Sequence, residues 1–205
     1  MTETRPIVSS KEWEAARKEL LPKEDELIRA RDALAAERRQ MPWMEVQDEY
    51  RFEGPNGSVT LVDLFEGRPQ LIVYRAFYGP DVTTYARGRS YPEYACVGCS
   101  FVADQLADAA HLHAKHTSLA FVSRAPQDAI QGLRKRHGWE HIPWYSLVDD
   151  FDKDFGVDGW HGHNVFLSEG DRIFRTYYVG GDVDQYLGGT LSYLELTALG
   201  RQEAT

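Results

Sequence analysis

The chain has 205 residues, of which 42% are hydrophobic, and this length suits one sizeable domain with an appendage. Its 32 acidic and 23 basic residues give a formal charge of −9, and no lysine and arginine cluster forms a stripe that could follow phosphates, so we expect no nucleic-acid partner. No apolar run is long enough for a secretory signal or a membrane span, so we expect a cytoplasmic protein that does not bind a membrane.

The first forty residues are predicted to form a helical arm. Ser9 and Glu12 have the spacing of a capping box, and Pro22 is placed to start a second helix, so the pattern predicts helices over residues 10–21 and 23–39. Both helices carry narrow apolar stripes that need another surface to cover them.

The domain organisation follows from this arm. We assign residues 1–42 to the N-terminal helical arm and residues 43–205 to the main domain. Because helices with a narrow apolar stripe often pack against a second copy of the same chain, we expect a homodimer formed through the arm.

The main domain alternates segments of strand and helix character. The pattern predicts a hairpin within 49–61, a short helix at 62–65, a buried strand at 70–77, a helix after Cys96 that carries apolar residues from 101 to 113, a strand at 117–123, a helix at 126–137, a strand at 144–148, a helical turn at 151–155, a hairpin over 164–179 and a helix at 189–199. This order predicts an α/β sandwich with a mixed sheet.

The only two cysteines, Cys96 and Cys99, lie where a loop enters a helix after a buried strand. Free N–H groups and the helix dipole at such a position lower a thiol pKa from about 8.5 to between about 3.5 and 7.5. Cys99, one turn further on, could then close a disulfide with Cys96, and Gly98 keeps the turn small. The pattern therefore favours a redox couple in a reducing compartment, where a structural disulfide is not expected.

Two other interpretations of the pair remain open. Both cysteines could be small apolar residues packed at a helix start. Alternatively, His161 and His163 in the stretch GWHGHN could join the two thiolates around zinc, although this spacing is not that of a compact zinc module.

Six segments of the chain together resemble a known family: QLIVYRAFYGP, CVGCSFVADQL, SLAFVSRAP, DFDKDFGV, NVFLSEGDRIFRTY and LSYLELTALGR. They are similar to an uncharacterised bacterial family with a thioredoxin-like fold, described as predicted dithiol–disulfide oxidoreductases. The resemblance implies a three-layer sandwich with a four- or five-stranded mixed sheet. It also implies that Cys96 is the nucleophile and Cys99 the resolving thiol for a thiol or disulfide substrate, with a separate reductant.

Two departures from better-known thioredoxin-like enzymes narrow the expected activity. The loop WHGHN lacks the proline that usually faces the cysteine pair, which favours a narrower activity than general protein reduction. Pro92 lies only four residues before Cys96, which does not match the peroxiredoxin pattern. A weak peroxidase activity of an exposed thiolate stays compatible with the sequence.

Further site residues are expected around the cysteines. If the fold is right, the GWHGHN loop faces the cysteines, and His163, or as a second choice His161, is a candidate proton donor or acceptor. The candidate substrate-binding residues carry positive charge or an aromatic ring: Arg87, Arg89, Tyr94 and Trp160. Ordinary loop roles are the competing interpretation of all of them.

No nucleotide-binding glycine motif is present, so we expect no cofactor. The leading hypothesis is therefore a thiol–disulfide oxidoreductase. The alternatives are a binding or assembly protein that keeps the scaffold without using its thiols, and a protein that binds metal through cysteine and histidine.

Overall fold

The computed structural model describes residues 6–79, 85–86, 89–90, 96–106, 108–157 and 160–180. The chain divides into two compact units, Met1–Pro42 and Trp43–Thr205, and each is described by itself. The helix expected at 189–199 lies outside the described residues. In the part that is described, no helix combines the length and the apolar character needed to cross a membrane.

The first unit contains one helix, α1 (Ser10–Arg38), rather than the two predicted. The capping box at its start is confirmed, since the Glu12 N–H donates to the Ser9 hydroxyl and the Ser9 N–H donates to the Glu12 carboxylate. The prediction of a break was wrong because Pro22 lies inside the helix. Proline removes one backbone hydrogen bond, and the 29-residue helix continues past it.

None of the residues of α1, all of which are described, is buried. Its exposed apolar side chains include Trp13, Leu20, Leu27 and Leu34, which follow one another at intervals of seven residues. The homodimer expected through this arm stays a prediction.

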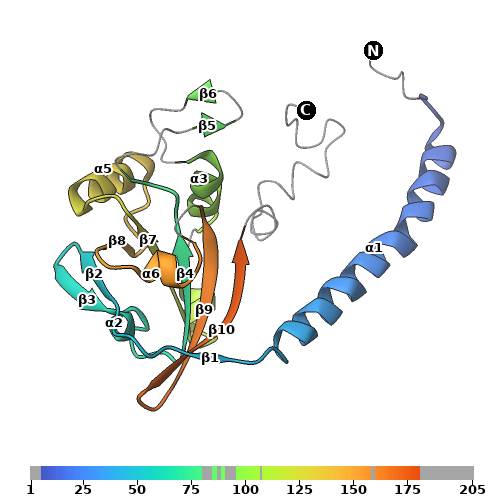
Figure 1. Cartoon of the computed structure of the whole chain (residues 1–205). Helices are drawn as coiled ribbons and strands as arrows, with labels where there is room; N and C mark the ends of the chain where they lie inside the picture. Colours follow the sequence, from blue (N-terminus) through green and yellow to red (C-terminus); the bar gives the residue numbers. More distant parts are fainter. Residues whose placement is uncertain are drawn as a thin grey trace. The chain divides into compact units, whose positions relative to one another are not determined.

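In the described part of the second unit, eight strands form one mixed sheet in the order β1-β10-β9-β4-β7-β8-β2-β3 (Figure 1). These strands are β1 (Met44–Glu45), β2 (Arg51–Gly54), β3 (Gly57–Thr60), β4 (Gln70–Arg75), β7 (Thr117–Ser123), β8 (Trp144–Leu147), β9 (Gly162–Glu169) and β10 (Arg172–Gly180). A separate pair consists of β5 (Tyr85–Ala86) and β6 (Arg89–Ser90).

The centre of the sheet combines parallel and antiparallel pairings. β4 runs parallel to β7 and antiparallel to β9, and β10 is antiparallel to β9. Helix α3 (Val97–Asp104) follows β4, so β4, α3 and β7 form the predicted crossover unit. The predicted α/β fold with a mixed sheet is confirmed.

The sheet is larger than the four or five strands that the resemblance implied. β8 pairs in parallel with β7, and the β2–β3 hairpin adds two further strands through the antiparallel pairing of β2 with β8. The two-residue strand β1 pairs with β10 at the other edge.

The remaining helices are α2 (Leu61–Leu64), α4 (Ala110–His113), α5 (Gln127–His137) and α6 (Phe151–Asp154). The prediction of one continuous helix after Cys96 was wrong, because α3 ends at Asp104 and α4 begins at Ala110. Leu106 and Leu112 both line a small apolar hollow with Leu119. The chain turns between the two helices, so that both leucines reach this site.

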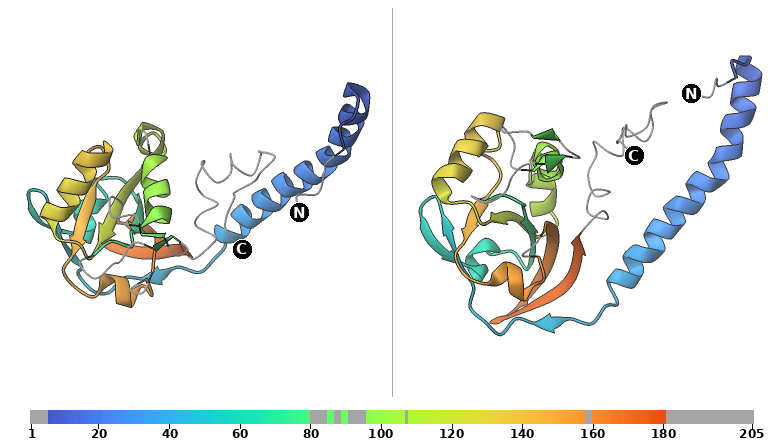
Figure 2. Two further views of the ribbon diagram at one scale, coloured as in Figure 1. Left: turned by 90° about the horizontal axis from the view of Figure 1, so that it is seen from above. Right: turned by 45° about the horizontal axis from the view of Figure 1, so that its top comes forward.

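The two faces of the sheet support separate cores. One core contains α2 and α6 and is rich in phenylalanine, and the other contains Cys99 with residues of α3 and α5. The left view of Figure 2 shows α3 and α6 on opposite sides of the strands. Successive side chains of β4 point to opposite faces of the sheet, so Val73 belongs to the first core and Tyr74 to the second.

At the open end of the β9–β10 hairpin, an aromatic ring lies directly against the backbone of two paired glycines. Gly162 and Gly180 are register partners, and the ring of Tyr178 lies against both. A Cβ atom at Gly162 would lie 2.7 Å from Cε2 of Tyr178, and one at Gly180 would overlap the Tyr178 hydroxyl. A side chain at either position would therefore require the Tyr178 ring to move.

Candidate redox site at the start of helix α3

The two cysteines occupy the first turn of α3. Cys96 is the N-cap residue, with extended backbone angles, and its carbonyl accepts the first helical hydrogen bond from Ser100 N–H at 2.8 Å. Cys96 is partly exposed, whereas Cys99 is only 1% exposed. Both are free thiols and approach each other to 3.5 Å, so a small movement would reach the S–S bond length of about 2.05 Å.

The surroundings of Cys96 favour its thiolate. The Cys99 thiol donates a hydrogen bond to the Cys96 sulfur, and this contact makes the largest contribution to lowering the Cys96 pKa to about 6. The backbone N–H groups of Cys99 and Gly98 and the positive charge of His161 act in the same direction, while burial opposes them. At pH 7 a pKa of about 6 leaves roughly 90% of the thiol ionised.

Cys99 has the opposite character. Burial, followed by the contact with Cys96, raises the Cys99 pKa well above its ordinary value. The Phe77 N–H donates a hydrogen bond to its sulfur, with a nitrogen–sulfur distance of 3.2 Å, and both this bond and the Tyr74 hydroxyl oppose the rise in the Cys99 pKa. The pair thus consists of one ionised, partly exposed thiol and one protonated, buried thiol.

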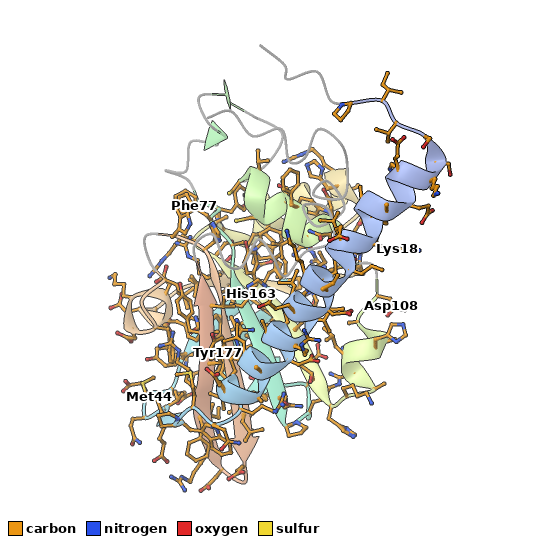
Figure 3. The ribbon with its side chains drawn as sticks, turned by 90° about the vertical axis from the view of Figure 1, so that its right-hand side faces the viewer. Lys18, Met44, Phe77, Asp108, His163 and Tyr177 are labelled. Atoms are coloured by element: carbon orange, nitrogen blue, oxygen red, sulfur yellow. The ribbon has the colours of Figure 1, made fainter. Side chains whose placement is uncertain are left out.

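Both histidines of the GWHGHN stretch lie on the cysteine face of the sheet. His161 is 3% exposed and His163 is 8% exposed. His163 is the register partner of Tyr74, and the two ring centroids are 4.4 Å apart (His163 is labelled in Figure 3). His161 is the histidine whose charge acts on the Cys96 thiol, whereas His163 packs on the tyrosine behind Cys99.

An aromatic surface leads from this site toward solvent. The ring centroids of Phe77 and Trp160 are 5.2 Å apart, and those of Trp160 and His161 are 4.9 Å apart (Phe77 is labelled in Figure 3). Trp160 is 51% exposed, and Phe77 and Cys96 pack against the same core. This surface could contact an apolar part of a substrate.

The other substrate-binding candidates cannot be placed at the site. Arg87 and Tyr94 lie outside the described residues, and only the backbone of Arg89, in β6, is described. Their proposed roles stay predictions.

Sequence reasoning missed Tyr74 and Phe77. A buried tyrosine hydroxyl usually finds a hydrogen-bond partner, so a tyrosine in the centre of the buried strand 70–77 was a usable signal. The direction of that hydroxyl, however, depends on how β4, α3 and β9 pack together. Among the residues that the structure describes, no three histidine, cysteine, aspartate or glutamate side chains are grouped so as to hold a metal ion.

The chain belongs to the family described as "Bacterial protein of unknown function (DUF899)", which matches residues 2–205. No curated protein matches the chain. The family assignment agrees with the resemblance noted in the sequence, and it covers both the arm and the main domain.

Several solved structures are similar to this chain at low sequence identity. A thiol:disulfide interchange protein from Bacteroides sp. is 15% identical, with a TM-score of 0.45, and the match covers 80% of this chain and 94% of the other. A putative thiol:disulfide interchange protein, DsbE, from Chlorobium tepidum is 12% identical, with a TM-score of 0.43 and coverage of 72% and 92%. The exposed lipoprotein thioredoxin Etrx1 from Streptococcus pneumoniae strain TIGR4 is 11% identical, with a TM-score of 0.44 and coverage of 68% and 96%.

Proposed function

We propose that the protein is a thiol–disulfide oxidoreductase in which Cys96 attacks and Cys99 resolves. The observation that carries this proposal is the asymmetry of the pair: a helix-capping thiol with a pKa of about 6 approaches a buried, protonated thiol to 3.5 Å. A nucleophile and its resolving partner need this division of roles.

The reaction balances as follows. The Cys96 thiolate attacks one sulfur of a substrate disulfide, forms a mixed disulfide and releases the other substrate sulfur as a thiolate. Cys99 then attacks the Cys96 sulfur and releases the second substrate thiol, which receives the Cys99 proton. The substrate disulfide gains two electrons, the protein becomes a disulfide, and a low-molecular-weight thiol or a dithiol protein must reduce it again.

The aromatic surface supports a substrate with an apolar group beside its disulfide. Trp160 is half exposed, and its ring centroid lies 4.9 Å from that of His161, the residue whose charge acts on Cys96. A bound substrate would cover Trp160 while its sulfur reaches Cys96. Trp160 fluorescence should therefore change when the mixed disulfide forms, and it should not change in Cys96→Ser.

The proposal is tested by titrating the purified full chain against glutathione redox buffers and counting free thiols by mass spectrometry. A single two-electron transition between dithiol and intramolecular disulfide, absent from Cys96→Ser, is the expected result. Thiols that stay reduced across the whole range of buffers would overturn the proposal and favour a binding or assembly protein. The metal content is measured in parallel, since co-purifying zinc released together with two thiols would support the metal-binding alternative.

A further inference from the structure

Two polar groups act on the buried sulfur of Cys99. The Phe77 N–H donates a hydrogen bond to it from the backbone just after β4, at 3.2 Å, and the hydroxyl of Tyr74, on β4 in the same core, acts to lower its pKa. Tyr74 and Cys99 belong to the same core and are 0% and 1% exposed. Neither donor is needed to explain why Cys96 is reactive, so their function concerns the second thiol.

The tyrosine ring is held firmly enough to aim its hydroxyl. Its centroid lies 4.8 Å from that of Phe121 in an edge-to-face contact and 4.4 Å from that of His163. The strand that carries it is paired on both sides, with β7 and β9. A donor fixed in this way needs little reorganisation when charge appears on the sulfur.

The resolving step places negative charge where burial disfavours it. Cys99 must lose its proton to attack Cys96, and an anion without donors in an apolar core is strongly disfavoured. Hydrogen bonds to the ionised sulfur favour the thiolate over the thiol. Tyr74 and the Phe77 N–H together form a small anion hole for this thiolate.

We propose that Tyr74 is a catalytic residue of the resolving step, donating its hydroxyl hydrogen bond to the Cys99 sulfur as that sulfur attacks the Cys96-linked mixed disulfide. The inference rests on the proposed function. In this step the Cys99–Cys96 bond forms and the bond from Cys96 to the substrate sulfur breaks. The proton of Cys99 passes to the departing substrate thiolate, and Tyr74 keeps its own proton throughout.

Loss of the Tyr74 hydroxyl should affect the two chemical steps, the first attack by Cys96 and the resolution by Cys99, differently. The groups named above as stabilising the Cys96 thiolate are Cys99, Gly98 and His161, so removal of the Tyr74 hydroxyl should leave the first attack almost unchanged. Tyr74→Phe retains the ring contacts with Phe121 and His163 and removes only the donor. A lost hydrogen bond to a charged group corresponds to a decrease of about tenfold or more in the rate of resolution.

The test uses the reduced full chain and oxidised glutathione as the probe, with acid-quenched samples analysed by mass spectrometry. Wild type should pass rapidly through the Cys96–glutathione adduct, whereas Tyr74→Phe should accumulate it while forming it at a rate within about twofold of wild type. Tyr78→Phe is the matched control, because the Tyr78 hydroxyl donates to the Ala129 carbonyl in the same core. It should behave like wild type.

A second readout separates this role from a structural one. In a Cys96→Ser background, the pKa of Cys99, followed by thiolate absorbance, should be higher when Tyr74 is also changed to phenylalanine. Unchanged resolution in Tyr74→Phe, or equal slowing of both steps, would overturn the inference. If wild type formed neither the adduct nor the internal disulfide, the proposed function itself would fail, and this result is distinct from a failure of the tyrosine assignment.

Discussion

The two faces of the central sheet are both well buried, but they bury different chemistry. On the face of α2 and α6, phenylalanine rings pack in edge-to-face and tilted pairs, such as Phe155 with Phe166 at 5.2 Å. On the face of α3 and α5, the buried groups include a thiol, two histidines and the hydroxyl of Tyr74. The difference indicates that one face mainly supplies stability while the other holds groups that can exchange protons and electrons.

The charged groups on the two faces of the sheet differ as well. On the phenylalanine-rich face, the fully buried Asp152 pairs with Arg75 at 3.3 Å and also binds Arg124, whose Nε lies 3.0 Å from the carboxylate. These groups neutralise one another within a fixed structural cluster. On the cysteine face, Cys96, whose pKa is lowered to about 6, is instead partly exposed.

The largest expected effect concerns Cys99 on the reactive face. Cys99→Ser should abolish multiple turnover but retain the first attack, because serine cannot form the internal disulfide. Incubation with oxidised glutathione followed by mass spectrometry should show a stable adduct on Cys96. If Cys99→Ser turned over as fast as wild type with the same added reductant, Cys99 would not be the resolving residue.

The next effect concerns the opposite face. Asp152→Ala removes a carboxylate that pairs with the buried Arg75 and should reduce the free energy of unfolding by about 3–5 kcal/mol, as measured by urea denaturation. Asp150→Ala is the control, because Asp150 pairs with Lys153 at the surface and should matter much less. Where Asp152→Ala remains folded, the pKa of Cys96 should stay near 6, and a large change would contradict the separation of the two faces.

A smaller effect is expected from the two histidines. The alkylation rate of Cys96 should rise with pH around a midpoint of about 6, because only the thiolate reacts. His161→Gln removes a positive charge that lowers this pKa, so the midpoint should move upward, while His163→Gln should leave it nearly in place. The reverse order would favour His163 as the residue beside Cys96.

The smallest effect is a change in the slope of the reduction potential with pH. Below pH 6 both thiols take up protons on reduction, so the potential should fall by about 59 mV per pH unit. Above pH 6 the product is one thiolate and one thiol, and the slope should decrease to about 30 mV per pH unit. A slope that stays constant between pH 5 and 8 would show that Cys96 does not ionise in this range.

Much of this arrangement could be predicted from local patterns. β-branched and apolar runs indicated the strands over 70–77 and 117–123, and the cysteine spacing indicated the start of α3. These signals lie within single segments, where periodicity and capping decide the structure. The same reasoning predicted a helix break at Pro22 that the structure does not contain, since one lost hydrogen bond does not outweigh a long run of helix-forming residues.

The rest depends on contacts between distant segments. Asp152 lies 77 positions after its partner Arg75, and the sequence around either residue does not reveal the other. Similarly, a tyrosine in a buried strand is ordinary, and the role of Tyr74 emerges only when the packing of α3 brings Cys99 to its hydroxyl. The two-residue strand β1 is too short to produce any alternation at all.

The contact of Tyr178 with Gly162 and Gly180 has a consequence for the evolution of the family. Because a Cβ atom at either glycine would meet the tyrosine ring, the three positions should covary. Relatives with a small residue in place of the tyrosine have room for alanine or serine at the two glycine positions, whereas relatives that keep the aromatic ring would have to move it. Gly162 lies between His161 and His163 in the chain. An alignment of the family would therefore show whether Tyr178, a residue outside the redox site, has restricted which residues occur beside these two histidines.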